Sequence, residues 1–176
     1  DFQESFMSAR LSIAIRIADS ANAVLQRVEA FNQEDVLNNE EWNMRAHAGI
    51  EPMLLALSME LALKAWFVFD YDTPEVKRSH NLSKLFARLK PESQNKLDSE
   101  FRRSVAPRHP NFFSIDYGIR DVLEHHKYAF IDWRYMHEAK SMSFNNSTFI
   151  ATLEMVLSEF KKRYRTEKVP PIWPTD

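Results

Sequence analysis

Apolar residues in the first part of the chain recur every three or four positions, which is the spacing of an amphipathic helix. This pattern predicts one long helix over about residues 3–31 and a second over about 41–69. Gly49 and Pro52 lie inside the second stretch, so the helix there either kinks or begins anew with Pro52 in its first turn. Beyond Pro52 the segment is apolar nearly all round, which predicts a central helix surrounded by others.

Shorter helices with clear start signals follow. Asn81 or Ser83 can cap a helix that runs to about residue 89, and Pro91 begins another that runs to about 103. Asp116 is a suitable N-cap for a helix to about residue 138, and a last helix covers about 148–165. The polar connections between these helices lie at about 32–39, 70–80, 106–114 and 141–147.

These elements predict an all-α fold, an up-and-down bundle of four to five main helices. The chain has 176 residues and only two glycines, which leaves little material for hairpin turns or glycine-rich phosphate loops. We expect a single domain over residues 1–168, followed by an extended, proline-rich tail over 169–176.

Composition narrows the possible chemistry. The chain has no cysteine, which excludes disulfides, thiolate catalysis and cysteine-ligated zinc and suits a cytoplasmic location. Its six histidines do not occur as H-x-x-x-H or H-E-x-x-H, so we expect no metal site and no cofactor. The net charge of −2 gives no overall basic field, and Glu60 and Lys64 interrupt the longest apolar stretch, so we expect no membrane segment.

The helix predicted from Asp116 carries the main candidates for catalysis. If it is continuous, His126 and His137 fall in the middle of its apolar face and Arg134 lies at the edge of that face. Arg134 and His137 are three positions apart and can act on one ligand, the imidazole by proton transfer and the guanidinium by binding a phosphate. The alternative, that each is a buried group satisfied by the core, stays open.

Arg120 and His125 form a second candidate pair on the same predicted helix. They fall on opposite flanks, about 140° apart at 100° per residue. Neither flank belongs to the apolar face, so the simpler interpretation is that both side chains are ordinary surface groups.

Glu60 and Lys64 are an i, i+4 pair in the most apolar segment of the chain. A lone charge there is costly, so we expect them to pair with each other or with polar groups on the helix that carries Arg134. A structural ion pair is a more common role for such residues than catalysis. We include Glu60 and Lys64, with His80, His126 and Trp133, among the candidate ligand-binding residues.

Three short elements occur in a recognisable order and spacing. They are Met59-Glu60-Leu61-Ala62-Leu63-Lys64-Ala65, then His80-Asn81-Leu82, then Trp133-Arg134-Tyr135 within the run that begins at Phe130. Together they resemble the HEPN superfamily of small helical domains. The resemblance covers about residues 52–138. It implies a bundle of four or five helices that is commonly dimeric, and many such domains are metal-independent RNases of toxin–antitoxin or phage-defence systems.

The catalytic motif that this resemblance implies is R-x4-6-H, with both residues contributed across a dimer interface. The chain departs from it, because Arg134 and His137 are spaced as R-x2-H. Arg120 and His125 match R-x4-H in number, without the asparagine that follows the arginine in many active members.

Two functions remain open. The first is a HEPN-like endoribonuclease, or an RNA- or nucleotide-binding protein, that forms a homodimer and has an antitoxin-like protein partner. The second is a non-catalytic helical module for dimerisation or protein interaction. A small-ligand pocket lined by Trp66, Trp133 and His137 is a third arrangement that the sequence allows.

Overall fold

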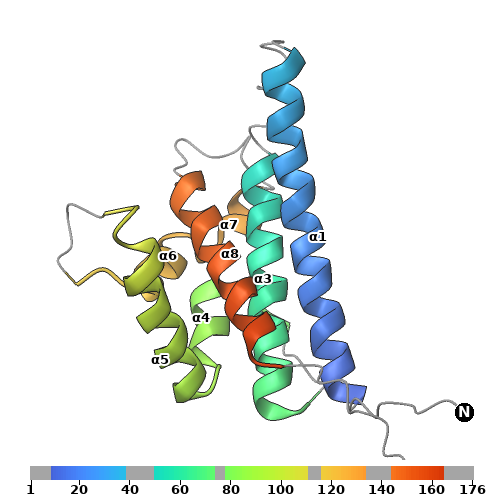
Figure 1. The fold of residues 1–176 in the computed structure, drawn as a ribbon, viewed down its shortest axis with the longest axis vertical. Helices are drawn as coiled ribbons and strands as arrows, with labels where there is room; N and C mark the ends of the chain where they lie inside the picture. The colour runs from blue at the N-terminus through green and yellow to red at the C-terminus, as the bar shows by residue number, and fades with distance from the viewer. Residues whose placement is uncertain (1–8, 39–49, 74–77, 111–115, 134–143, 165–176) are drawn as a thin grey trace, which may run out of the picture.

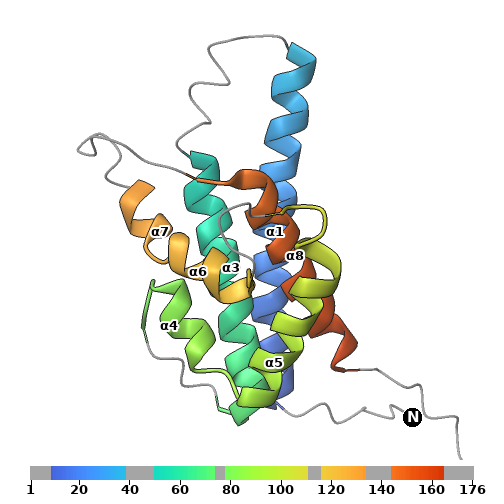
Figure 2. The same ribbon diagram turned by 90° about the vertical axis from the view of Figure 1, so that its left-hand side faces the viewer.

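A computed structural model describes residues 9–38, 50–73, 78–110, 116–133 and 144–164, and every regular element in these ranges is a helix. The all-α prediction is therefore confirmed. The two long helices predicted at the start of the chain lie side by side as α1, Ala9–Asn38, and α3, Ile50–Tyr71 (Figure 1). The short helices that follow α3 in the chain lie on the other side of α3 from α1, whereas the last helix, α8, Asn146–Lys162, crosses α3 and also contacts α1 (Figures 1 and 2).

Helix α1 packs against α3 through a row of small and branched apolar side chains. The buried members of this row are Ala14, Ala18, Ala21, Leu25 and Val28. Their small size lets the two backbones approach closely, and Ser58 Oγ of α3 donates a 2.7 Å hydrogen bond to the Ala21 carbonyl. The helix continues to Asn38, so the polar connection predicted from residue 32 was wrong.

Helix α3 is the central element, as its apolar sequence predicted. Helix α8, Asn146–Lys162, crosses it, and Trp66 Nε1 donates a 3.1 Å hydrogen bond to the Val156 carbonyl. Among the described helices, α3 alone is long and apolar enough to cross a membrane by length and composition, but 61% of its most apolar window is buried inside the fold. Pro52 lies in the first turn of α3, which was one of the two positions that the sequence allowed for it.

Two short helices begin where the sequence signals predicted. Asn81 caps α4, Leu82–Ala87, because its side-chain oxygen accepts a 2.8 Å hydrogen bond from the Lys84 amide. Pro91 begins α5, Pro91–Glu100, which continues as a π-helical turn, η1, Phe101–Val105. The sequence predicted a regular α-helix to about residue 103. The structure differs from this prediction in the wider, π-helical turn at its end.

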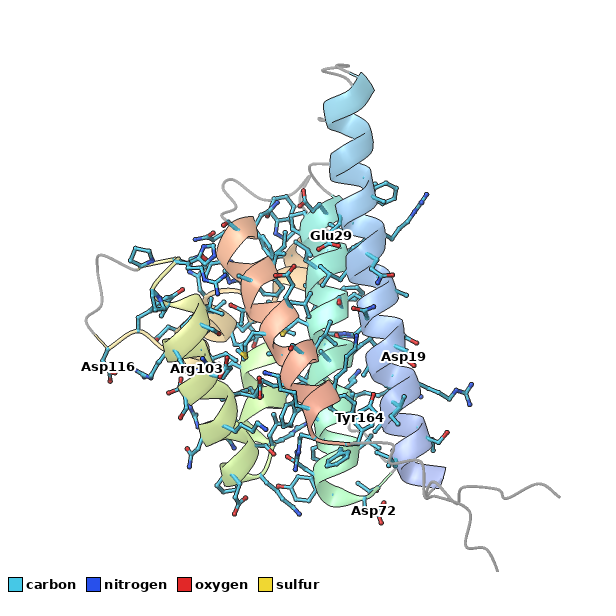
Figure 3. The ribbon with its side chains drawn as sticks, viewed as in Figure 1. Asp19, Glu29, Asp72, Arg103, Asp116 and Tyr164 are labelled. Carbon is cyan, nitrogen blue, oxygen red and sulfur yellow. The ribbon has the colours of Figure 1, made fainter. Side chains whose placement is uncertain are left out.

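The single helix predicted over 116–138 is broken. Helix α6 covers Ile119–His125, a turn follows, and α7 covers Ala129–Asp132. Gly118 occupies the N-cap position, and its amide donates a 2.8 Å hydrogen bond to the Asp121 carboxylate. Asp116, the predicted N-cap (labelled in Figure 3), instead accepts a 2.5 Å hydrogen bond from Arg102.

The break between α6 and α7 is held by tertiary contacts. The Lys127 carbonyl accepts a 3.1 Å hydrogen bond from the Leu82 amide at the start of α4, so it is used across the bundle rather than within a helix. Because α6 and α7 do not form one helix, the apolar face that the sequence predicted from residue 119 onward is not continuous.

A buried carboxylate ties three helices together at the end of α3. The Asp70 side chain is fully buried and accepts hydrogen bonds from the Lys90 amide (2.9 Å), Ser93 Oγ (2.7 Å) and Arg163 Nη1 (2.5 Å). The Arg163 guanidinium also lies over the Phe69 ring, 4.4 Å from its centroid. This node joins α3 and α5 to the C-terminal end of α8.

Candidate functional site

Three residues that the sequence singled out meet on one side of α3. Glu60 and Lys64, one turn apart, form the expected ion pair, with 2.5 Å between Lys64 Nζ and Glu60 Oε1. The second carboxylate oxygen, Oε2, lies 2.9 Å from Nδ1 of His80, which comes from the connection before α4. The Glu60 side chain is 4% exposed, so this carboxylate is buried with both oxygens engaged.

The His80 ring is held on two sides and open on the others. Glu60 engages its Nδ1 atom, and the ring stacks on Phe130 of α7 with 5.1 Å between centroids and an interplanar angle of 25°. Half of the His80 side chain is nevertheless exposed to solvent. A carboxylate at Nδ1 fixes the hydrogen on that nitrogen, which leaves Nε2 with a lone pair that can accept a proton.

The turn between α6 and α7 lies beside this cluster. Lys127 Nζ forms a 2.5 Å ion pair with Glu124, and hydrogen bonds from Lys127 and then from Ser83 lower the pKa of the Glu124 carboxyl. The same pair raises the pKa of Lys127. Both groups are therefore charged at neutral pH, and they fix the turn against the first residues of α4.

His126 is buried, as predicted, but both of its ring nitrogens are used by the backbone. Nδ1 donates to the Val122 carbonyl at 2.8 Å, and Nε2 accepts from the Asn145 amide at 3.2 Å. Burial lowers the pKa of His126 to about 4, so the ring is neutral at physiological pH. It joins α6 to the start of α8 and leaves no nitrogen for a ligand.

Arg120 and His125 do not converge within one chain. Arg120 donates from Nη2 to the Gln94 side chain and lies over the Phe86 ring, 5.4 Å from its centroid. His125 is exposed at the other end of α6 and packs edge-on against His126. An R-x4-H site built from this pair would need a group from a second protomer.

The other predicted catalytic residues, Arg134 and His137, lie outside the residues that the structure describes. Trp133 is the last described residue before them and the C-cap of α7. Its ring packs edge-on against Phe144, 6.3 Å between centroids, rather than against His80. In the described part of the chain, no group of three or more His, Asp or Glu side chains is arranged to hold a metal ion.

Two surface hollows were not predicted. One, of about 230 Å³, lies between η1 and α8 and includes Glu100, His109, Glu159 and Lys162 in its lining. The carboxylate of Glu159 in this lining is buried and pairs with Lys162.

The second hollow, of about 290 Å³, is an apolar groove between α1 and α3. Ile13, Arg16, Ile17, Ser20 and Leu61 line it. The sequence predicted that α3 would be surrounded by other helices, whereas Leu61 is only partly buried here.

Comparison with known proteins found no matching family model, curated protein or solved structure. The chemistry of the Glu60–Lys64–His80 cluster therefore carries the functional argument.

Proposed function

We propose that this chain is a HEPN-like helical domain that binds single-stranded RNA or nucleotides, with His80 as its proton-transfer residue. One observation carries the proposal: a half-exposed histidine has its Nδ1 held by a buried carboxylate and its ring stacked on an aromatic side chain. This is the arrangement of a base and its orienting group. The resemblance of the Glu60 and His80 segments to HEPN domains supports the same conclusion.

Burial of Glu60 gives this contact its chemical value. A carboxylate shielded from water interacts strongly with an imidazolium, so Glu60 stabilises the protonated ring while it holds the ring in place. Lys64 keeps the buried carboxylate compensated when His80 is neutral. His80 can then accept and return a proton without movement of the surrounding helices.

The corresponding reaction is transesterification of RNA. His80 takes the proton of a ribose 2′-hydroxyl as O2′ forms a bond to the adjacent phosphorus. The P–O5′ bond breaks, and protonated His80 returns the proton to O5′ through water, which gives a cyclic phosphate and a 5′-hydroxyl end. Proton transfer and stabilisation of phosphate charge account for the chemistry. Arg78 and Lys84 are exposed on either side of His80 in the chain and provide positive charge.

Cleavage of a labelled single-stranded RNA in the presence of EDTA tests the proposal. His80→Gln is expected to lower the rate by about 100-fold or more, the usual contribution of general acid–base catalysis. Glu60→Gln should lower it less, because an amide still accepts a hydrogen bond from Nδ1 but carries no charge. The matched control is His109→Gln. His109 lies beside η1 and far from the cluster in the sequence, so this variant should retain full activity.

Separate Ala variants of Arg120, His125, Arg134 and His137 distinguish this site from an R-x-H site. If these four abolish cleavage and His80→Gln does not, the catalytic role belongs to them and not to His80. A wild-type protein that neither cleaves nor binds RNA or nucleotides contradicts the proposal as a whole.

The apolar groove between α1 and α3 favours a second candidate, a non-catalytic module for dimerisation or protein interaction. Ile13, Ile17 and Leu61 are partly exposed there. Sedimentation of the wild-type protein and of Ile17→Asp tests it. A dimer that the substitution converts to monomer, in a protein without affinity for RNA, would support this candidate over the first.

A further inference from the structure

We infer that Tyr128 and Lys127, in the turn between α6 and α7, form a subsite on which a nucleobase stacks beside His80. The inference rests on the proposed function and names the part of the ligand that this surface recognises. Its ligand is a base with its attached phosphate, in single-stranded RNA or in a free nucleotide.

Tyr128 presents an aromatic ring to solvent. Its side chain is 42% exposed, whereas most large apolar side chains in the described part of the chain are covered. Its backbone is fixed, because the Tyr128 carbonyl accepts hydrogen bonds from the amides of Ile131 (2.8 Å) and Asp132 (2.9 Å) in α7. An exposed ring on a fixed backbone stacks on a base at little entropic cost, and every base offers a flat face to it.

Lys127 adds a positive charge over one face of this ring, which leaves the other face for a base. Its Nζ atom lies 5.8 Å from the centroid of Tyr128, and its ion pair with Glu124 keeps the ammonium in place. An ammonium beside an aromatic ring is the combination that proteins use to hold a base and its neighbouring phosphate.

Two contacts place this turn next to His80. The Lys127 carbonyl accepts a hydrogen bond from the Leu82 amide, two residues beyond His80. Phe130, two residues beyond Tyr128, stacks on the His80 ring. These contacts place the turn that carries Tyr128 beside His80, and the exposed cations Arg78 and Lys84 belong to the same segment as His80.

A second tyrosine supplies a matched comparison. Tyr71 is 45% exposed, and Lys90 Nζ lies 5.6 Å from its ring centroid, so its local chemistry is almost the same. Tyr71 ends α3, however, and Figure 1 shows α7 toward the opposite end of that helix. The Tyr71 ring also leans on Phe67, with 4.8 Å between centroids. Position beside His80 is what distinguishes Tyr128.

Fluorescence anisotropy of a labelled twelve-residue oligouridylate, in EDTA and low salt, tests the inference. Tyr128→Ala is expected to weaken binding by about 5- to 100-fold, the usual effect of removing one stacked ring. Tyr128→Leu keeps the apolar bulk but removes the ring, so it should weaken binding to a similar degree, and Tyr128→Phe should bind almost as the wild type. Tyr71→Ala should leave binding unchanged.

Competition by AMP separates the two sources of the ligand. Displacement of the oligonucleotide by AMP from the wild type, but not from Tyr128→Leu, supports a subsite open to free nucleotides. Binding that AMP does not displace, and that still falls in Tyr128→Leu, supports a subsite specific for the strand.

The inference and the proposed function fail in different ways. If the wild type binds the oligonucleotide and the Tyr128 variants bind equally well, the stacking subsite is wrong while the proposed function stands. If the wild type binds neither the oligonucleotide nor AMP, both are wrong.

Discussion

His80 and His126 differ in what surrounds their rings. His126 is buried with both nitrogens bonded to backbone groups, whereas His80 is half exposed with its Nδ1 atom on a buried carboxylate. The first arrangement stabilises the fold and the second leaves a nitrogen for chemistry. The sequence marked both residues, but it could not distinguish them, because the distinction depends on Asn145 and Glu60, which lie 19 and 20 residues away.

The lowered pKa of His126 predicts a pH-dependent loss of stability. The unfolded chain binds a proton at this residue near pH 6.5, whereas the folded protein resists protonation until about pH 4. The contribution of His126 to the free energy of unfolding is therefore fully present above pH 6.5. It is lost as the pH decreases toward 4, by roughly 3 kcal/mol in total. Urea unfolding of the wild type at pH 7 and pH 5 should show much of this loss.

The control is His126→Gln, which cannot titrate in this range. Its own stability at pH 7 will be lower, so the quantity to compare is the change between the two pH values. An equal change in His126→Gln and in the wild type would show that other groups cause the pH dependence.

The Glu60–Lys64 pair shows what spacing alone can predict at this scale. A charged side chain on an apolar helix needs a partner close by, and the i, i+4 spacing predicted that Glu60 and Lys64 pair with each other. The observed ion pair confirms this prediction. His80 joins the same carboxylate from a separate connection, a tertiary contact that no local spacing encodes.

Among the helices, those with strong terminal signals were predicted best. Asn81 and Pro91 mark the starts of α4 and α5 because a side-chain cap and a fixed proline φ act locally. The α6–α7 region was predicted worst, because its apolar spacing runs on across the break, where the Lys127 carbonyl is bonded to the start of α4 instead.

A glycine is required at position 118, the start of α6, because the side chains of Asp98 and Arg102 lie against it. A Cβ atom there would lie 2.5 Å from Asp98 Oδ1 and 2.8 Å from Arg102 Nη2. Asp98 Oδ1 also accepts a 3.1 Å hydrogen bond from the Ile119 amide, so it cannot move away freely. Gly118→Ala should destabilise the protein by about 1–3 kcal/mol, as overpacking usually does.

Thermal unfolding monitored by circular dichroism measures the effect of Gly118→Ala. The double variant Gly118→Ala/Asp98→Ala lacks the obstructing carboxylate. Its loss of stability should therefore be smaller than the sum of the losses in the two single variants. Fully additive losses would mean that the added methyl group meets no obstruction from Asp98.

For the molecule as a whole, the all-α class followed from composition, since two glycines and long amphipathic stretches leave little else. How the helices are joined did not follow. Asp70 and Arg163 are 93 residues apart, and neither stands out in the sequence, because one ends an apolar helix and the other lies in a cationic run. The extent to which α3 is left uncovered also depended on tertiary packing.

The Asp70 node should dominate global stability. Arg163→Met leaves a fully buried carboxylate without its cation and should lower the free energy of unfolding by about 3–5 kcal/mol. Asp70→Asn keeps an acceptor for the Lys90 amide and removes the charge, so the double variant should be less destabilised than the sum of the single changes. Urea denaturation of the three variants checks this, and a loss below about 1 kcal/mol in Arg163→Met, the range of an exposed pair, would contradict it.

The most direct test of the central claim is a histidine NMR experiment. The Cε1–Hε1 signals of the wild-type protein are recorded while oligouridylate is added, and the spectra of His80→Gln and His109→Gln assign the two signals. If oligouridylate binds beside His80, the His80 signal shifts in proportion to bound oligonucleotide while the His109 signal stays in place. A His80 signal that does not move while the oligonucleotide binds elsewhere, or a protein that does not bind it, would contradict this role of His80.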